Sequence, residues 1–183
     1  MTPITVWTKQ HRCVLEELQK TGRYVAKREH ILQNEDAYLM RTAYDWLVRA
    51  HPDRANRPAD ADYPVWVSER RETTMLLSAD TVILELAVDP ARITSINIAK
   101  WGMINNFSYI PANPADEKRH KQLLKDLGIS DAKAYMSRFY PELKQEIEDS
   151  WMRAFDDSIQ PGNQQAYGLI WELRREWIQC VIQ

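Results

Sequence analysis

The sequence predicts a single α+β domain over residues 1–183, with helices clustered between the early and middle strands and the late strands. Strand-like runs occur near the start, the middle and the end of the chain, and helix-like segments lie between them. Strands and helices do not alternate regularly, which disfavours a doubly wound parallel sheet. The chain also has an ordinary length for one domain with its own core.

The first predicted element is a strand over Ile4–Lys9, where β-branched residues are frequent and polar and apolar residues alternate. Apolar residues on one helical face then predict a helix; they are Val14, Leu15 and Leu18. Gly22 is expected to end this helix in the left-handed conformation. A short strand over Tyr24–Ala26 is expected to follow.

Asn34 is positioned to cap the second helix, and the two acidic residues after it suit a first helical turn. Helical spacing predicts that its buried stripe consists of Leu39, Met40, Ala43, Trp46 and Leu47. The polar segment His51–Asp62 contains prolines and little apolar bulk, so we expect a loop.

The middle of the chain carries two predicted strands, Tyr63–Ser68 and Thr81–Val88. Asp89-Pro90 stops the second strand, because proline lacks the amide that a sheet requires. Ser95 is then placed to cap a helix that runs to about Asn105.

Three further helices are predicted after a proline-rich loop. Asn113-Pro114 combines a cap with a first-turn proline, for a helix through Leu127 that Gly128 ends. Ser130 and Pro141 each begin another helix. Apolar residues repeat every fourth position in the last one and predict a buried stripe of Leu143, Ile147, Trp151 and Phe155.

The final predicted strands are Gln165–Leu173 and Trp177–Ile182.

The formal net charge of −2 argues against general electrostatic binding to nucleic acid or to acidic membranes. We expect a cytoplasmic protein with no membrane partner, since the sequence has neither a signal-peptide pattern nor an apolar run of membrane-spanning length. The oligomeric state is left open. Cysteine usage fits a reduced compartment, although pairing of Cys13 with Cys180 stays open.

Most standard catalytic signatures are missing from the sequence. The five glycines are not clustered into a phosphate-binding loop, and the four histidines lack metal-ligand spacing, so no metal site is expected. Cys13 falls beside Val14 on a helical stripe, where a packed thiol is the expected state. The basic segment Lys118–Lys121 is expected to be an exposed helix face.

Glu172 is the candidate catalytic residue, because it is a single carboxylate in the apolar, strand-like run Ala166–Leu173. A carboxylate in a sheet costs several kcal/mol unless it has a partner, a wet cleft or a chemical task. Strand periodicity places Glu172 on one face with Gly168 and Ile170, and a glycine there allows a ligand to approach closely.

Two other strands carry polar side chains that define the rest of a predicted site. Thr8 and Gln10 share one face of the first strand, and Trp66 and Ser68 share one face of the middle strand. If these faces converge with Glu172, a hydroxyl, an amide, an aromatic wall and a carboxylate line one cleft.

The alternative interpretation needs no site at all. Thr8 and Ser68 are then ordinary strand residues, and Glu172 forms an ion pair with Arg174 or Arg70. Sequence alone leaves both interpretations open.

Several segments, taken in order, resemble a domain-of-unknown-function family of bacteria. They are Val6–Gln10, Ala43–Leu47, Tyr63–Trp66, Leu84–Val88 with Trp101 and Asn105-Asn106, Glu148–Trp151 and Ile170–Leu173. This resemblance covers nearly the whole chain and implies no particular activity.

A second resemblance is to the ADP-ribosyltransferase superfamily. It rests on an opening strand with a polar residue, a helix that ends in glycine, a middle strand with a hydroxyl or aromatic side chain, and a late strand with one glutamate. The resemblance implies an ADP-ribosyltransferase-like central sheet, NAD as the substrate without a metal, and a protein or nucleic acid as the acceptor.

The same resemblance implies roles for individual residues. Glu172 would bind the ribose 2′-hydroxyl and support catalysis, while the NAD-binding residues would be Thr8, Gln10, His11, Trp66 and Ser68. The chain departs from the superfamily pattern because its first strand contains neither arginine nor histidine, and His11 directly follows that strand.

Two other classes of function remain as alternatives. A non-catalytic interaction or inhibitor module, of the phage-defence or toxin–antitoxin type, predicts a broad exposed aromatic patch. The tryptophans that test it are Trp66, Trp101 and Trp171. An RNA-directed enzyme or binder predicts a basic groove beside the cleft. The arginines that test this one are Arg70, Arg71 and Arg174.

Overall fold

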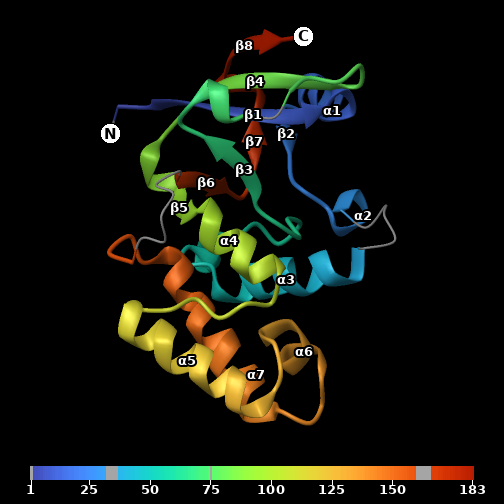
Figure 1. Cartoon of the computed structure of the whole chain (residues 1–183). Helices are drawn as coiled ribbons and strands as arrows, with labels where there is room; N and C mark the ends of the chain where they lie inside the picture. The colour runs from blue at the N-terminus through green and yellow to red at the C-terminus, as the bar shows by residue number, and fades with distance from the viewer. Residues whose placement is uncertain (1, 32–36, 75, 160–165) are drawn as a thin grey trace. The chain divides into compact units, whose positions relative to one another are not determined.

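The structure, a computed structural model, describes residues 2–31, 37–74, 76–159 and 166–183 (Figure 1). The described chain is α+β, as the sequence predicts. It forms two compact units, which are described separately below. The first unit comprises Met1–Ser95 and Ala166–Gln183, and the second comprises Ile96–Gln165.

A six-stranded sheet has the order β5-β6-β3-β1-β4-β8. Its strands are β1 (Ile4–His11), β3 (Val65–Ser68), β4 (Thr81–Val88), β5 (Thr94–Asn97), β6 (Ala166–Ile170) and β8 (Ile178–Ile182). The pairs β1–β3, β1–β4, β3–β6 and β4–β8 are antiparallel. A separate two-stranded sheet pairs β2 (Arg23–Tyr24) with β7 (Leu173–Arg174).

The core of the first unit lies on one face of the larger sheet. It contains alternate residues of several strands together with helix α1 (Arg12–Thr21), whose buried residues are Val14 and Leu18. Gly22 ends α1 at φ 80°, the left-handed conformation that the sequence predicts. The sheet residues of this core are Val6, Val65, Val67, Val82, Leu84, Leu86, Val88 and Ile170.

Helix α3 (Ala37–Ala50) is tied to β3 and to the residues just before it by side-chain hydrogen bonds. The Trp66 indole donates to the Tyr44 hydroxyl at 3.0 Å, and the Tyr63 hydroxyl donates to Asp45 at 2.8 Å. The predicted cap of this helix, Asn34, lies outside the described residues. A short helix α2 (Arg28–Ile31) comes before it.

The predicted apolar stripe of α3 is partly wrong. Ala43, Trp46 and Leu47 are buried, whereas Leu39 is 36% and Met40 41% exposed. Among the side chains of this helix whose burial is described, Leu39 and Met40 are exposed and the buried ones lie from Ala43 onward, so periodicity identified the correct face but not how much of the helix packs.

The second unit contains α4 (Ile98–Asn105), α5 (Pro114–Leu127), α6 (Asp131–Met136) and α7 (Pro141–Ser150). The last three begin as predicted, since Asn113 and Ser130 cap through their side chains and Pro141 starts α7, and Gly128 ends α5 at φ 62°. The predicted stripe of α7 is buried at Leu143, Ile147 and Trp151, but the α-helix ends at Ser150 and Phe155 is only half-buried. A stack of aromatic rings forms the centre of this unit. Phe107 lies parallel to Tyr135 at 4.8 Å, and Tyr135 contacts Trp151 at 5.0 Å.

Two predictions about element boundaries are wrong. Ser95 does not cap α4 but lies in β5, and the side chain of Asn97 caps α4 instead, accepting from the Ala99 amide at 2.9 Å. Both residue types are good caps, so local pattern alone does not choose between them. The run predicted as one strand to Leu173 breaks after Ile170, and Glu172 lies between β6 and β7.

Five short 3₁₀ helices complete the described elements. They are η1 (Arg54–Asn56), η2 (Arg71–Thr73), η3 (Pro90–Arg92), η4 (Trp151–Phe155) and η5 (Arg175–Trp177).

Gly168 in β6 is required by packing. A Cβ at this position would lie 2.5 Å from Ile93 Cγ2 and 2.7 Å from Val67 Cγ2. Gly168→Ala is therefore expected to destabilise the protein by about 1–3 kcal/mol, because an overpacked core must shift. Chemical denaturation measures the effect. Gly102→Ala is the matched control: its Cβ meets nothing within 4 Å inside α4, so it should be neutral or stabilising.

Candidate functional site

Thr8 and Gln10 lie together on β1, and their polar groups bond to each other and to the sheet. The Thr8 hydroxyl donates to the Trp66 carbonyl at 2.7 Å, and the Gln10 amide donates to the Thr8 hydroxyl at 2.7 Å. His11 caps α1 by accepting from the Cys13 amide at 3.3 Å. The side chains of Thr8, Gln10 and His11 therefore all have hydrogen-bond partners within the protein.

Trp66 and Ser68 lie on the opposite face of the sheet from Thr8. Ser68 is paired with Trp7 across the β1–β3 ladder, and directly paired residues project to the same side. Since neighbours along a strand alternate, Thr8 and Gln10 project to the other side. The Ser68 hydroxyl is used locally, because it donates to the Arg70 carbonyl at 3.0 Å.

The predicted convergence of three strand faces on one cleft is therefore wrong. The register separates Trp66 and Ser68 from Thr8 and Gln10, and a shift of one residue would have been needed to bring them together. Among the described residues that line the cleft beside Glu172, none of the five predicted NAD-binding residues occurs.

Glu172 instead joins two arginines of the two-stranded sheet. Arg23 and Arg174 are direct cross-strand partners, which places like charges side by side. Glu172 Oε2 accepts from Arg23 Nε at 2.5 Å, and Oε1 accepts from Arg174 Nε at 2.7 Å. Asp60 holds the other end of Arg23 with bonds of 2.7 and 3.1 Å. Negative and positive side chains therefore alternate from Asp60 through Arg23 and Glu172 to Arg174, and these bonds fix the orientation of the Glu172 carboxylate.

The Glu172 carboxylate is ionised at neutral pH. Burial works to raise its pKa, but hydrogen bonds from Arg23 and Arg174 outweigh burial and hold the pKa below its ordinary value. Glu172 is 7% exposed. It can therefore accept hydrogen bonds and stabilise positive charge, whereas it cannot serve as a general acid near neutral pH.

A cleft of about 530 Å³ opens beside Glu172, within the first unit. This volume is in the range of small-molecule sites. Its polar and aromatic lining comes from three segments of the unit and consists of Asp53, Asn56, Asp89, Arg92, Trp171, Glu172, Arg174 and Trp177. The arrangement combines carboxylates for hydroxyl groups, guanidinium groups for anions and an indole for a flat ring.

Trp171 lines this cleft and is held by two contacts. Its indole donates to the Asp53 carbonyl at 3.1 Å, and its ring lies 4.4 Å from that of His51. His51 is 1% exposed, and burial lowers its pKa to about 4, against a small opposing effect of Asp53.

This lowered pKa predicts acid sensitivity. The unfolded chain binds a proton at His51 near pH 6.5, and the folded chain does so only near pH 4, so stability should fall as pH drops through this window. The loss should reach about 2 kcal/mol between pH 7 and pH 5. Urea unfolding at both pH values measures it. His51→Asn should remove most of the difference, and an unchanged slope in that variant would contradict the assignment.

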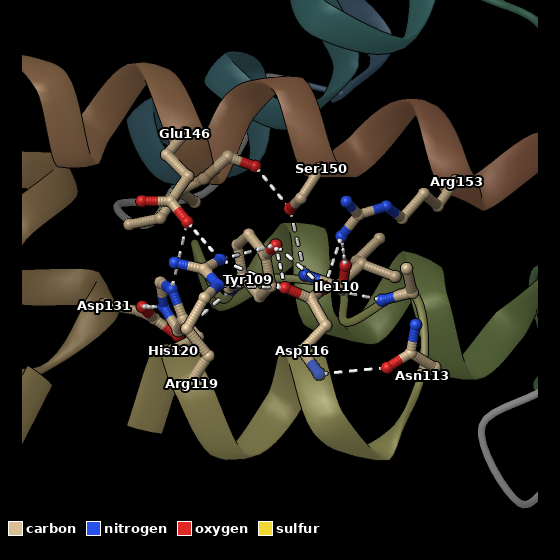
Figure 2. Close-up of polar contacts among 12 residues, drawn as sticks. Tyr109, Ile110, Asn113, Asp116, Arg119, His120, Asp131, Glu146, Ser150 and Arg153 are labelled. Carbon is tan, nitrogen blue, oxygen red and sulfur yellow. Dashed lines mark hydrogen bonds and ion pairs between the residues drawn. The ribbon is translucent and has the colours of Figure 1, made fainter. Parts of the chain in front are cut away.

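A second cluster of polar side chains lies in the second unit, and Figure 2 shows it centred on the Asp116 carboxylate. Asp116 accepts from the Tyr109 hydroxyl at 2.9 Å, from the Ala112 amide at 2.8 Å and from Arg119 at 3.0 Å. Arg153 contributes a further ion pair to it at 3.2 Å.

His120 is buried against this cluster, so the expected exposed basic face of α5 is wrong at this residue. Its ring stacks on Tyr109 at 3.9 Å, and its Nε2 lies 2.7 Å from Asp131. Lys118 and Lys121 are exposed, as predicted. Burial of His120 follows from its position on the helix, because in a polar helix one residue can face inward while its neighbours in sequence face solvent. The charge of the segment, on which the prediction was based, does not show this.

A groove of about 590 Å³ runs beside the same cluster and is lined by Tyr109, Glu142, Glu146, Asp149 and Arg153. Its charged groups are largely engaged: Glu146 pairs with Arg119 at 2.5 Å, and Arg153 pairs with Asp116. We interpret this cluster as structural, because Asp116, Tyr109, Arg119 and Arg153 bond to one another, although His120 Nδ1 is buried without a hydrogen-bond partner. The cleft at Glu172 is the candidate functional site.

Other predictions about single side chains have mixed outcomes. Cys13 is exposed rather than packed, because it precedes the buried face of α1. Both cysteines are free thiols. Trp101 is 7% and Trp171 6% exposed, which weakens the exposed aromatic patch expected of an interaction module, and Trp66 is half-buried.

Within the described chain, no helix combines the length and the apolar character needed to cross a membrane.

A family model described as a domain of unknown function, DUF3841, matches residues 5–179. No curated protein and no solved structure matches the chain.

Proposed function

The chain belongs to the DUF3841 family, a domain of unknown function, so its activity must be inferred from the cleft itself. We propose that it is an ADP-ribosyltransferase-like enzyme that cleaves NAD at Glu172 and transfers ADP-ribose to a protein or nucleic acid. The single observation that carries the proposal is an ionised, nearly buried carboxylate on the wall of a cleft of about 530 Å³.

The reaction would break the bond between nicotinamide and ribose, and the bonding electrons would leave with neutral nicotinamide. The ribose carbon then resembles an oxocarbenium ion, as in glycoside hydrolysis. A fixed carboxylate stabilises this developing positive charge more than it stabilises the ground state, which accelerates the step. An oxygen or nitrogen atom of the acceptor forms the new bond and releases a proton.

The remaining residues of the cleft suit other parts of NAD. Carboxylates such as Asp53 and Asp89 accept hydrogen bonds from ribose hydroxyl groups, as acidic residues do in dinucleotide sites. The half-buried Trp177 ring offers a surface on which a base can stack. The site thus differs from the one that the superfamily resemblance implies, and only Glu172 is common to both.

The test is to incubate the purified protein with NAD and to follow nicotinamide release, with and without added protein or RNA acceptors. Release above the uncatalysed background supports the proposal, even without an acceptor, because water can replace it. If the protein neither binds NAD in calorimetry nor releases nicotinamide, the proposal is wrong.

A further inference from the structure

Two arginines share one aromatic ring in the Glu172 cleft. The guanidinium carbon of Arg92 lies 5.7 Å from the centre of the Trp177 ring, and that of Arg174 lies 5.9 Å from it. Cation–π contacts of this kind hold guanidinium groups in place while leaving their N–H groups available. Both arginines line the cleft.

The same two arginines approach one carboxylate oxygen. Glu172 Oε1 lies 2.7 Å from Arg174 Nε but 3.9 Å from the nearest nitrogen of Arg92. Arg92 therefore lacks a hydrogen bond to this oxygen, and its side chain is 54% exposed. Arg174 is shared between Glu172 and Glu176, which lies 3.6 Å from it, so Arg92 is the guanidinium group of the pair that a further anion can engage most readily.

The other two acidic residues of the cleft, Asp89 and Asp53, form hydrogen bonds within local turns. Asp89 uses Oδ1 to cap η3 by accepting from the Ala91 amide at 3.0 Å, and Asp53 Oδ1 accepts from Asn56 at 2.6 Å. Both are positioned by local turns, whereas Arg92 and Arg174 converge on Trp177.

We propose that Arg92, Trp177 and Arg174 form a subsite for the diphosphate group of a nucleotide. Two forked guanidinium groups match the oxygens of two linked phosphates better than those of one. The inference rests on the proposed function and deepens it. A diphosphate that engages Arg174 would release Glu172 Oε1, which could then accept a ribose hydroxyl.

The test is isothermal titration calorimetry with inorganic pyrophosphate, ADP, AMP and NAD. Pyrophosphate and ADP should bind to the wild-type protein, and AMP should bind more weakly. Arg92→Gln should weaken binding of pyrophosphate and ADP roughly tenfold or more, as expected for the loss of a charge-assisted bond. The matched control is Arg175→Gln, an exposed arginine outside the cleft, which should bind like the wild type.

Each outcome decides one of the two claims. If pyrophosphate and ADP do not bind, or if Arg92→Gln binds them as the wild type does, the subsite is wrong. If both bind in an Arg92-dependent manner but NAD is not cleaved, the subsite stands and the proposed function fails. If NAD is cleaved equally well by Arg92→Gln, the proposed function stands without this subsite.

Discussion

Glu172→Gln is expected to reduce NAD turnover at least 100-fold, the usual effect of removing one electrostatic stabiliser of a transition state. The amide that replaces the carboxylate is neutral, so it cannot offset the developing positive charge on ribose. The same change should lower stability, since it leaves Arg23 and Arg174 facing each other across the small sheet without the carboxylate that joins them.

The stability loss should be about 1–3 kcal/mol, below the value for a fully buried pair because solvent screens the arginines. Stabilisation by the Glu172 carboxylate is present above its ordinary pKa and lost as pH falls through its lowered folded pKa. The difference between variant and wild type should therefore be larger at pH 7 than in strong acid. Calorimetric unfolding measures stability, and nicotinamide release well below the melting temperature measures turnover.

Glu176→Gln is the matched control for Glu172→Gln. Glu176 also pairs with Arg174, at 3.6 Å, but its side chain is 70% exposed and does not line the cleft. This variant should keep its turnover and lose less than about 0.5 kcal/mol. Wild-type turnover in a folded Glu172→Gln protein would contradict the catalytic role.

Asp116→Ala is expected to lower the free energy of unfolding by about 2–4 kcal/mol, more than Glu172→Gln. The change removes the shared acceptor of the Tyr109 hydroxyl, the Ala112 amide and two arginines (Figure 2). The arginines keep other partners, since Arg119 still pairs with Glu146 and Arg153 still donates to the Ile110 carbonyl. Chemical denaturation followed by tryptophan fluorescence measures the loss, because Trp151 lies in the same unit.

The pKa of Asp116 gives this prediction a pH dependence. Burial works to raise the pKa, but bonds from Ala112, Tyr109 and Arg119 lower it to about 2. Its contribution should be complete above about pH 4, the unfolded value, and should disappear as pH falls toward 2. Asp126→Ala, on the exposed side of α5, is the control and should change stability little. A small loss for Asp116→Ala would mean that the cluster does not hold the unit together.

Local signals predicted much of the fold. The caps at Gly22, Asn113 and Gly128 act within a few residues of themselves, and the strand Thr81–Val88 is marked by its own alternation. These features depend only on residues close in sequence and not on the element that packs against them, so they can be predicted from the sequence alone.

The site could not be predicted in the same way, because it depends on pairing between distant segments. The bond from Arg23 to Glu172 spans 149 positions, and the face of Ser68 depends on its register with Trp7. The sequence suggested Arg174 as a partner of Glu172, because the two residues are only two positions apart. Arg23 and Arg92 are distant in sequence, so no local pattern indicated that they lie near Glu172.

The most direct test of the account is a crystal structure of the protein with an unreactive NAD analogue. We expect the analogue in the cleft beside Glu172, with a ribose hydroxyl within hydrogen-bonding distance of that carboxylate. An analogue bound elsewhere on the chain, with both Glu172 oxygens still paired to Arg23 and Arg174, would contradict the account.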